Sequence, residues 1–531
     1  MILAWLIIIL MTGGLLSWII SRINPDLSKW ISLIFVTISF LMGLSIWFGN
    51  GPTIDIANAG EGWIHHLKLE WIPQFGISFH LAMDGLSLVL VVLTLFLGVI
   101  AVLVSWTKVK EKAGFYYFNL LWILSGIIGV FLAMDLFLFY FFWEVMLIPM
   151  YLLIGIYGYE RRIYAAYKFF IFTQASGLLM LLSILGLYFL YGLETGTYTF
   201  NYFELLNSSF TGEVGMLLML GFLIAFVVKL PGFPFHQWLP DAHTQAPTAG
   251  SLIMAGVLLK TGAYGILRFV LPLFPEASAV FAPIAMILGV IGILYGAKLA
   301  FAQTDLKRLV AYSSVSHMGF IMIGAFTFNE WATQGVVIQI VAHGISTGAL
   351  FMLVGVIQER IHTRNTEDLG GLWTQVPWMG GVGVIFAMAS LGLPGFGNFI
   401  AEFLILVGTF QVSIWAAVLA ATGLVFSSVY SLRILQTVFY GEPKKTWELP
   451  DLNAREMTMF GAMTVVIIFI GLYPQPVLDS SKVTVDEILN NDQENIEEVK
   501  FDEGFSREFR ETIHFQEAVS SSNHLMQNKE D

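Results

Sequence analysis

The sequence predicts an all-α polytopic membrane protein with about 14 transmembrane helices. Of its 531 residues, 57% are hydrophobic and only 12% are charged, whereas a soluble domain carries about 25% charged residues. Apolar runs of about 18 residues or more, the length that crosses ~30 Å of hydrocarbon, recur along the chain. Because few polar segments separate these runs, we expect one helical bundle rather than several domains.

The first apolar run, MILAWLIIILMTGGLLSWII, lacks a positively charged leader and a small-residue cleavage pattern, so we expect a retained first span rather than a signal peptide. After Gln475 the chain turns polar and carries much of the acid behind the net charge of −12. We therefore expect one membrane domain over residues 1–478 and a polar acidic tail over residues 479–531. The fourteen or so apolar runs of the membrane domain are centred near Ile9, Val36, Phe96, Leu124, Met146, Leu178, Leu223, Val257, Leu288, His317, Val341, Ala389, Leu424 and Ile468.

Lysine and arginine alternate between rich and poor connections, as they do between the two sides of a membrane. The poor connections hold little beyond Lys68 and Arg268. This alternation fits fourteen spans with both termini on the non-cytoplasmic side. One connection expected in the cytoplasm, residues 231–248, has no lysine or arginine at all. The rich connections carry Arg22 and Lys29; Lys108, Lys110 and Lys112; Arg161 and Arg162; Lys307 and Arg308; Arg360 and Arg364; and Lys444, Lys445 and Arg455.

The chain contains no cysteine. This excludes disulfides, thiolate metal sites, a cysteine nucleophile and the usual ligands of an iron–sulfur cluster, so any redox chemistry must take place in a partner. A metal site built from histidine and carboxylate is also disfavoured, because no such pair shares ligand spacing on one helix. Haem is disfavoured as well, since the histidines do not form an obvious facing pair.

Six ionisable residues fall inside predicted spans, Lys229 on condition that its span continues past the prolines that follow it. Each charged side chain at the centre of a span costs about 2.5–3.5 kcal/mol, so these groups need partners or water and indicate an ion or proton path. The purely structural alternatives are an interhelical hydrogen bond for the glutamate on the fifth span and ordinary core packing for the histidines. Lys168 and Lys298 fit interface anchors, while Asp84 and Asp135 fit helix starts. The six residues are Glu144, Lys229, Lys260, His317, His343 and Glu402.

A short repeat predicts two broken helices. Leu-Pro-Gly-Phe occurs at residues 230–233 and again at 393–396, each time within a span and close to an ionisable residue. Proline removes a backbone donor and glycine tolerates unusual dihedrals, so both spans should be interrupted. Paired interruptions in two halves of a chain are typical of transporters built from inverted repeats, and they mark the conduction site. The residues expected at the breaks are Pro231, Gly232, Pro234, Pro394 and Gly395.

Several long stretches resemble the antiporter-like membrane subunits of respiratory complex I, the NADH:quinone oxidoreductase. They are FFWEVMLIPMYLLIG, KLPGFPFHQWLPDAHTQAPTAGSLIMAGVLLKTGAYGILRF, FAQTDLKRLVAYSSVSHMGF, IVAHGISTGALFML, ERIHTR and GLPGFGNFIAEF. The resemblance runs from about Leu3 to Leu478. It implies fourteen helices in two inverted five-helix repeats, here about residues 115–270 and 280–440, with the seventh and twelfth helices discontinuous. The polar tail is longer than this family leads us to expect.

The resemblance also implies roles. Glu144 on the fifth helix would pair with Lys229 on the seventh, and Lys260 on the eighth would pass protons through His317 and His343 to Glu402 on the twelfth. The chain would then be a translocating subunit of an enzyme in the bacterial cytoplasmic membrane, without a redox centre or cofactor of its own. NADH, FMN, iron–sulfur clusters and quinone would belong to partner subunits. The expected partners are adjacent antiporter-like membrane subunits, indirectly the peripheral redox arm, and the lipid bilayer, with no nucleic acid.

Two other functions remain open on the sequence alone. A subunit of a multi-subunit cation/proton antiporter or of a membrane-bound hydrogenase would share many of these motifs; an antiporter would show sodium- or potassium-dependent proton flux without NADH oxidation. A non-conducting scaffold would only hold a redox arm to the membrane. Buried charge argues against the scaffold, because it would gain nothing from carrying it.

Overall fold

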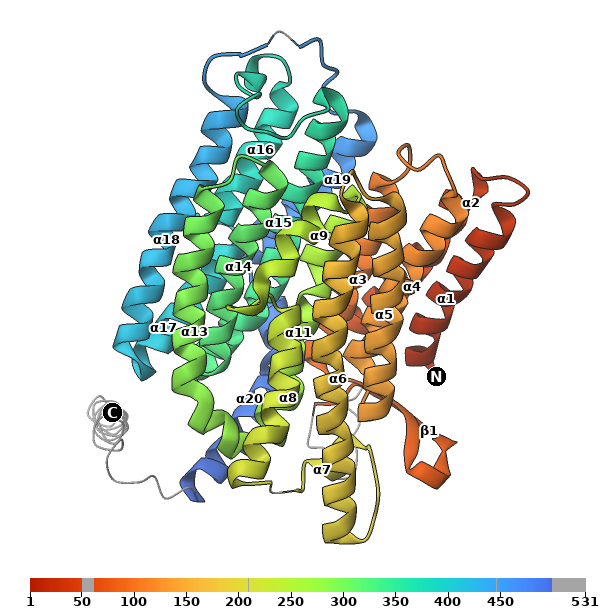
Figure 1. Ribbon diagram of the computed structural model, residues 1–531, viewed down its shortest axis with the longest axis vertical. Helices are drawn as coiled ribbons and strands as arrows, with labels where there is room; N and C mark the ends of the chain where they lie inside the picture. The colour runs from red at the N-terminus through yellow and green to blue at the C-terminus, as the bar shows by residue number, and fades with distance from the viewer. Residues whose placement is uncertain (50–61, 209, 446, 499–531) are drawn as a thin grey trace, which may run out of the picture.

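The computed structural model describes residues 1–49, 62–208, 210–445 and 447–498. Its helices stand side by side in one bundle, with α1 and α2 at one edge and α13 and α18 at the opposite edge (Figure 1). In the N-terminal half the helices are α1 (Ile2–Ile20), α2 (Leu27–Phe48), α3 (Gly85–Val104), α4 (Ala113–Leu132), α5 (Leu136–Tyr157), α6 (Arg162–Thr195), α7 (Tyr202–Leu205), α8 (Gly212–Lys229), α9 (Trp238–Gln245), α10 (Thr248–Ile253), α11 (Lys260–Gly265) and α12 (Leu271–Leu273). In the C-terminal half they are α13 (Pro275–Phe301), α14 (Leu306–Ala325), α15 (Glu330–Ile361), α16 (Pro377–Ser390), α17 (Gly397–Val412), α18 (Ile414–Ile434), α19 (Ala454–Leu472) and α20 (Gln475–Glu498).

The predicted number of spans is confirmed. Within the described ranges, 12 helices are long and apolar enough to cross a membrane, counting α10–α12 as one continuous helix. The 20-residue α14 adds a thirteenth. The two shorter apolar helices α16 and α17 follow one another and together make the fourteenth.

Two aspartates start spans as predicted. The Asp84 side chain accepts a hydrogen bond from the backbone N–H of Ser87 in the first turn of α3. The Asp135 side chain accepts from the backbone N–H groups of Phe137 and Leu138 in the first turn of α5. Side-chain oxygens at this position satisfy donors that have no partner within the helix, which fixes where each helix begins.

Both copies of the Leu-Pro-Gly-Phe quartet lie where a helix stops. The helix α8 ends at Lys229, and after a turn and a 3₁₀ segment the chain resumes as α9. In the second copy α16 ends at Ser390 and α17 starts at Gly397. There the backbone of Gly392 and Gly395 has φ of +79° and +101°, conformations that favour glycine. Each break therefore ends one half-helix beside a buried ionisable residue.

A β-hairpin lies between the second and third spans. Its strands β1 (His65–Ile72) and β2 (Ile77–Met83) pair antiparallel, with His65 opposite Met83. β2 leads directly into Asp84, so the hairpin continues into the capped start of α3.

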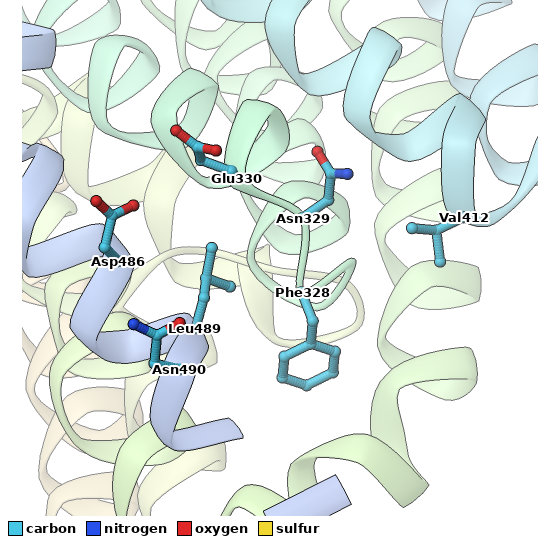
Figure 2. A pocket seen from close by; sticks show the side chains of 7 residues that line it. All are labelled: Phe328, Asn329, Glu330, Val412, Asp486, Leu489 and Asn490. Atoms are coloured by element: carbon cyan, nitrogen blue, oxygen red, sulfur yellow. The ribbon is translucent and has the colours of Figure 1, made fainter. Parts of the chain in front are cut away.

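The first part of the predicted polar tail belongs to a helix, α20, that packs on the bundle. α20 packs against α3, α13 and α15 and buries one apolar stripe, because its apolar residues recur at helical spacing. Beside it lies a pocket of about 380 Å³ (Figure 2). Residues 499–531, the rest of the tail, lie outside the described residues. The buried stripe is Val477, Val485, Ile488 and Leu489, and the pocket is lined by Phe328, Asn329, Glu330, Val412, Asp486, Leu489 and Asn490.

A buried polar cluster joins α20 to the transmembrane helices. The Asp84 carboxylate pairs with the Arg268 guanidinium and also accepts a hydrogen bond from the Thr484 hydroxyl of α20, 2.8 Å away. The Arg268 guanidinium lies over the Trp63 ring, 5.0 Å from its centroid. All three polar side chains are at most 3% exposed. The cluster therefore holds the start of α3, the helix that carries Arg268 and the C-terminal helix together.

Candidate functional site

The centre of the bundle holds Lys260 in direct contact with a histidine. Lys260 Nζ donates a hydrogen bond to the Ala255 carbonyl oxygen at 2.6 Å and lies 2.7 Å from His343 Nδ1 on α15. Both side chains are fully buried. The lysine and the histidine, predicted separately from two spans, thus form one hydrogen-bonded pair.

Irregular turns flank this lysine in its own helix. Residues 254–258 and 266–270 adopt π-helical turns on either side of α11. A π turn shifts the backbone hydrogen bonds from i−4 to i−5, and such turns are frequent at functional sites. The Ala255 carbonyl that accepts from Lys260 belongs to the first of these turns. These turns could not be predicted from the sequence, because the run from Ser251 to Phe269 has the pattern of a regular apolar helix.

The polar line continues from His343 to the second helix break. The rings of His343 and His317 meet edge to face with centroids 5.4 Å apart. His317 Nδ1 lies 2.9 Å from Glu402 Oε1 on α17. A Cβ at Gly392 would come within 2.7 Å of Glu402 Oε2, so the glycine of the break makes room for this carboxylate. The structure therefore brings Lys260, His343, His317 and Glu402 into one line through the protein interior.

The other end of the predicted path is arranged differently from the expected ion pair. Lys229, the last residue of α8, is fully buried, and its ammonium has no hydrogen-bond partner in the described part of the chain. It lies over the Trp143 ring, 4.7 Å from the centroid. Glu144 instead accepts a hydrogen bond of 3.2 Å from Gln174 on α6. Among the residues that the structure describes, Lys229 and Glu144 thus form no direct ion pair.

The two lysines are on helices that touch. Gly262 of α11 packs so closely on the end of α8 that a Cβ there would lie 2.5 Å from the Phe226 carbonyl oxygen. In the described ranges no hydrogen bond joins Lys229 to Lys260. A proton passing between them would need water.

Three buried polar residues near this line were not predicted. His243 on α9 stacks on Phe351 with centroids 4.2 Å apart, and neither ring nitrogen has a partner in the part of the chain that is described. The Tyr430 hydroxyl on α18 lies 3.1 Å from His317 Nε2. Lys307, which the charge census counted among loop residues, is fully buried and donates to the Ala246 carbonyl at 2.8 Å.

One signal in the sequence pointed to this region. The connection 231–248 has no lysine or arginine of its own, and neighbouring helices supply the positive charge instead. Asp241 of α9 forms an ion pair with Lys168 of α6 at 2.6 Å and a longer one with Arg308 of α14 at 3.5 Å. Lys168 is therefore bound to a helix end, where the sequence predicted only an interface anchor. Lys298, the other predicted anchor, is exposed.

The site is a proton-handling arrangement by composition. A lysine, two histidines and a glutamate follow one another along it, and each can hold or release a proton. Among the described residues, no group of three histidine, aspartate or glutamate side chains is placed to hold a metal ion.

Comparisons with known proteins converge on one family. The family model described as NADH:quinone oxidoreductase/Mrp antiporter, TM, matches residues 133–427. NADH-quinone oxidoreductase subunit M of Pseudomonas aeruginosa is 54% identical over 492 residues, which cover 91% of this chain and 97% of that protein. The subunit M of Escherichia coli strain K12 is 53% identical over 496 residues, covering 92% of this chain and 97% of that protein.

Solved structures agree with the sequence comparisons. A chain of respiratory complex I from Thermus thermophilus with bound NADH superposes with a TM-score of 0.83 at 28% identity, covering 93% of this chain and 99% of that one. A chain of the Mrp complex from Dietzia sp. DQ12-45-1b shares the fold, with a TM-score of 0.80 at 20% identity over 92% of this chain and 97% of that one.

Proposed function

Because the chain belongs to the NADH:quinone oxidoreductase/Mrp antiporter family of membrane subunits, we propose that it is subunit M of a bacterial NADH–quinone oxidoreductase and moves protons across the membrane. Electron transfer from NADH to quinone would take place in partner subunits. Identity above 50% to proteins named subunit M, over more than nine-tenths of the chain, supports this assignment over an Mrp-type antiporter.

One observation carries the proton-moving role. A line of buried groups runs from Lys260 through His343 and His317 to Glu402. Lys229 and Glu144 lie on the Lys260 side of this line. Burying such groups costs several kcal/mol, which a purely structural subunit would have no reason to bear. The line therefore fits a path along which protons are passed from one helix break to the other.

The separation of Glu144 from Lys229 at the first helix break can act as a control point for proton movement along the path. Desolvation disfavours a charged lysine, and a nearby carboxylate favours it, so the distance between Glu144 and Lys229 governs whether the lysine keeps its proton. We infer that redox chemistry in the partner subunits changes this distance and releases protons toward Lys260.

The driving energy must come from outside this chain. Moving one proton against the membrane potential costs about 2.3 kcal/mol per 100 mV. The chain has no cysteine to bind an iron–sulfur cluster, so we assign NADH, FMN, clusters and quinone to other subunits. We further propose a bacterial cytoplasmic membrane location with both termini on the non-cytoplasmic side, as the lysine and arginine pattern predicts.

Replacing Lys260 by methionine tests the proton path. Methionine fills the space of the lysine stem but neither donates to Ala255 nor holds a proton, so proton pumping driven by NADH should fall about three- to tenfold. That range corresponds to losing one ordinary buried hydrogen bond of about 0.7–1.4 kcal/mol. Pumping would be measured as acidification of inside-out vesicles, divided by the amount of assembled complex.

The matched control is Lys298→Met, which removes an exposed lysine at the end of a span. Unchanged pumping in Lys260→Met, with the complex assembled, would remove Lys260 from the path. If the chain copurifies without a redox arm and drives sodium-dependent proton flux instead, the oxidoreductase assignment is wrong and the antiporter is right.

Tyr430 is expected to orient His317 for proton transfer. An ionised Glu402 only accepts hydrogen bonds, so a neutral His317 must carry its hydrogen on Nδ1, and Nε2 must accept from the Tyr430 hydroxyl. Tyr430→Phe removes that hydroxyl and should lower pumping about two- to tenfold, the effect of one buried hydrogen bond. The solvent deuterium isotope effect on pumping should rise as well, because transfer at His317 becomes slower.

Tyr116→Phe is the matched control. Tyr116 is a buried tyrosine whose hydroxyl bonds to Ser105, away from the polar line. An equal isotope effect in both variants would show that Tyr430 only contributes packing.

A further inference from the structure

The ammonium of Lys229 is enclosed by aromatic rings. Its Nζ lies 4.7 Å from the centroid of the Trp143 ring on α5 and 5.7 Å from the centroid of the Phe169 ring on α6. No hydrogen-bond acceptor reaches it within the described residues. We call these two rings the aromatic cage.

The cage is rigidly supported. Trp143 packs against Phe139 and Phe226, with ring centroids 5.7 and 5.6 Å away. Phe169 packs against Trp238 at 5.3 Å. Trp238 in turn donates its indole N–H to the Val228 carbonyl oxygen at 2.8 Å, in the last turn of α8. The cage is therefore fastened to the helix end that presents Lys229.

Glu144 lies beside the same tryptophan but not against the lysine. A Cβ built on Gly177 of α6 would meet Trp143 Nε1 at 3.5 Å and Glu144 Oε1 at 3.6 Å. Glu144 is held on that side by Gln174. The lysine thus occupies the face of the Trp143 ring, while the Glu144 carboxylate lies toward Gly177 and Gln174 on α6 and makes no hydrogen bond to the lysine.

An aromatic face attracts a cation because its π electrons are negative above the ring, and the attraction is strongest for tryptophan. In a desolvated site this corresponds to about a two- to thirtyfold change in an equilibrium constant. The attraction requires a charged lysine and disappears when the proton leaves. A cage of this kind stabilises a charged Lys229 that is separated from its carboxylate.

We propose that the aromatic cage is a second binding position for the charged Lys229 side chain, which the lysine occupies when it is not paired with Glu144. Trp143 is then a positioning residue: it sets the balance between the separated arrangement seen here and a paired one. The proposal rests on the proposed proton-moving function and adds the device that holds the lysine in its separated state.

The test varies the charge on the ring face without changing its shape. Tryptophan analogues with increasing numbers of fluorine atoms, placed at position 143 of the chain in the assembled complex, weaken the cation attraction stepwise. NADH-driven pumping per assembled complex should fall in the same order, about two- to thirtyfold across the series. Trp143→Leu should lie at or beyond the weak end of that series.

The same series at Trp122 is the matched control. That indole donates to the Met11 carbonyl oxygen, and no cation lies over its ring in the described ranges. A purely structural role for Trp143 would give pumping independent of fluorination even if Trp143→Leu fails to assemble, and this result would overturn the cage. Pumping that is flat across the series while Glu144→Gln abolishes it rejects only the cage, whereas full pumping in Glu144→Gln rejects the control point itself.

Discussion

Replacing Glu144 by glutamine is expected to lower NADH-driven proton pumping at least about tenfold, because the carboxylate is the charge that acts on Lys229. Glutamine has the same size and keeps a hydrogen-bonding oxygen for Gln174, so the fold should persist. Without the negative charge, the lysine loses the partner toward which it could move from the aromatic cage. The measurement is acidification of inside-out vesicles by NADH, compared with NADH oxidation by an artificial acceptor that needs only the redox arm.

Glu194→Gln provides the comparison on the same part of the chain. Glu194 is exposed near the C-terminal end of α6, away from the buried line. We expect Glu194→Gln to pump normally and Glu144→Gln to oxidise NADH with the artificial acceptor at the normal rate. Equal pumping in the two variants would mean that Glu144 is an interhelical hydrogen-bonding residue and no more.

The features that could be predicted from the sequence are residues that apolar membrane helices usually avoid. Prolines and glycines in the middle of apolar runs predicted two breaks, and α8 and α16 end at those quartets. Charged residues in such runs, like Lys260 and Glu402, stood out because each is costly in hydrocarbon. Span number followed from run length alone.

What the sequence left hidden depends on packing between distant segments. The Tyr430 hydroxyl is unremarkable in an apolar run, and only the approach of α18 to α14 brings it to His317. Lys307 looked like a loop residue because it lies at a span border, yet Ala246 from another element accepts its hydrogen bond. Glu144 bonds to Gln174 and Lys229 lies over the Trp143 ring, and no linear pattern gives these contacts. The repeat ranges 115–270 and 280–440 stay predictions.

Replacing Arg268 by methionine is expected to destabilise the protein by about 3–5 kcal/mol, the usual cost of leaving a buried charge without its partner. Asp84 would remain between Ser87 and Thr484 with no positive charge beside it. The loss would appear as a lower unfolding temperature of the purified complex and as less of this chain in the membrane. Arg22→Met, at an exposed arginine, should leave both unchanged.

The pH dependence separates this electrostatic cause from a packing defect. Burial raises the pKa of Asp84, but Arg268 and the hydrogen bonds from Ser87 and Thr484 outweigh it and hold the pKa below its usual value. In the wild type the stability from this carboxylate is therefore present above about pH 4 and is lost as the pH falls through the lowered pKa. In Arg268→Met burial is less opposed, the pKa rises, and the deficit should shrink as acid protonates Asp84. Removing both charges in Asp84→Leu/Arg268→Met should recover part of the stability at neutral pH. A deficit that stays constant with pH and persists in the double variant would assign the loss to the packing of the Arg268 guanidinium over the Trp63 ring.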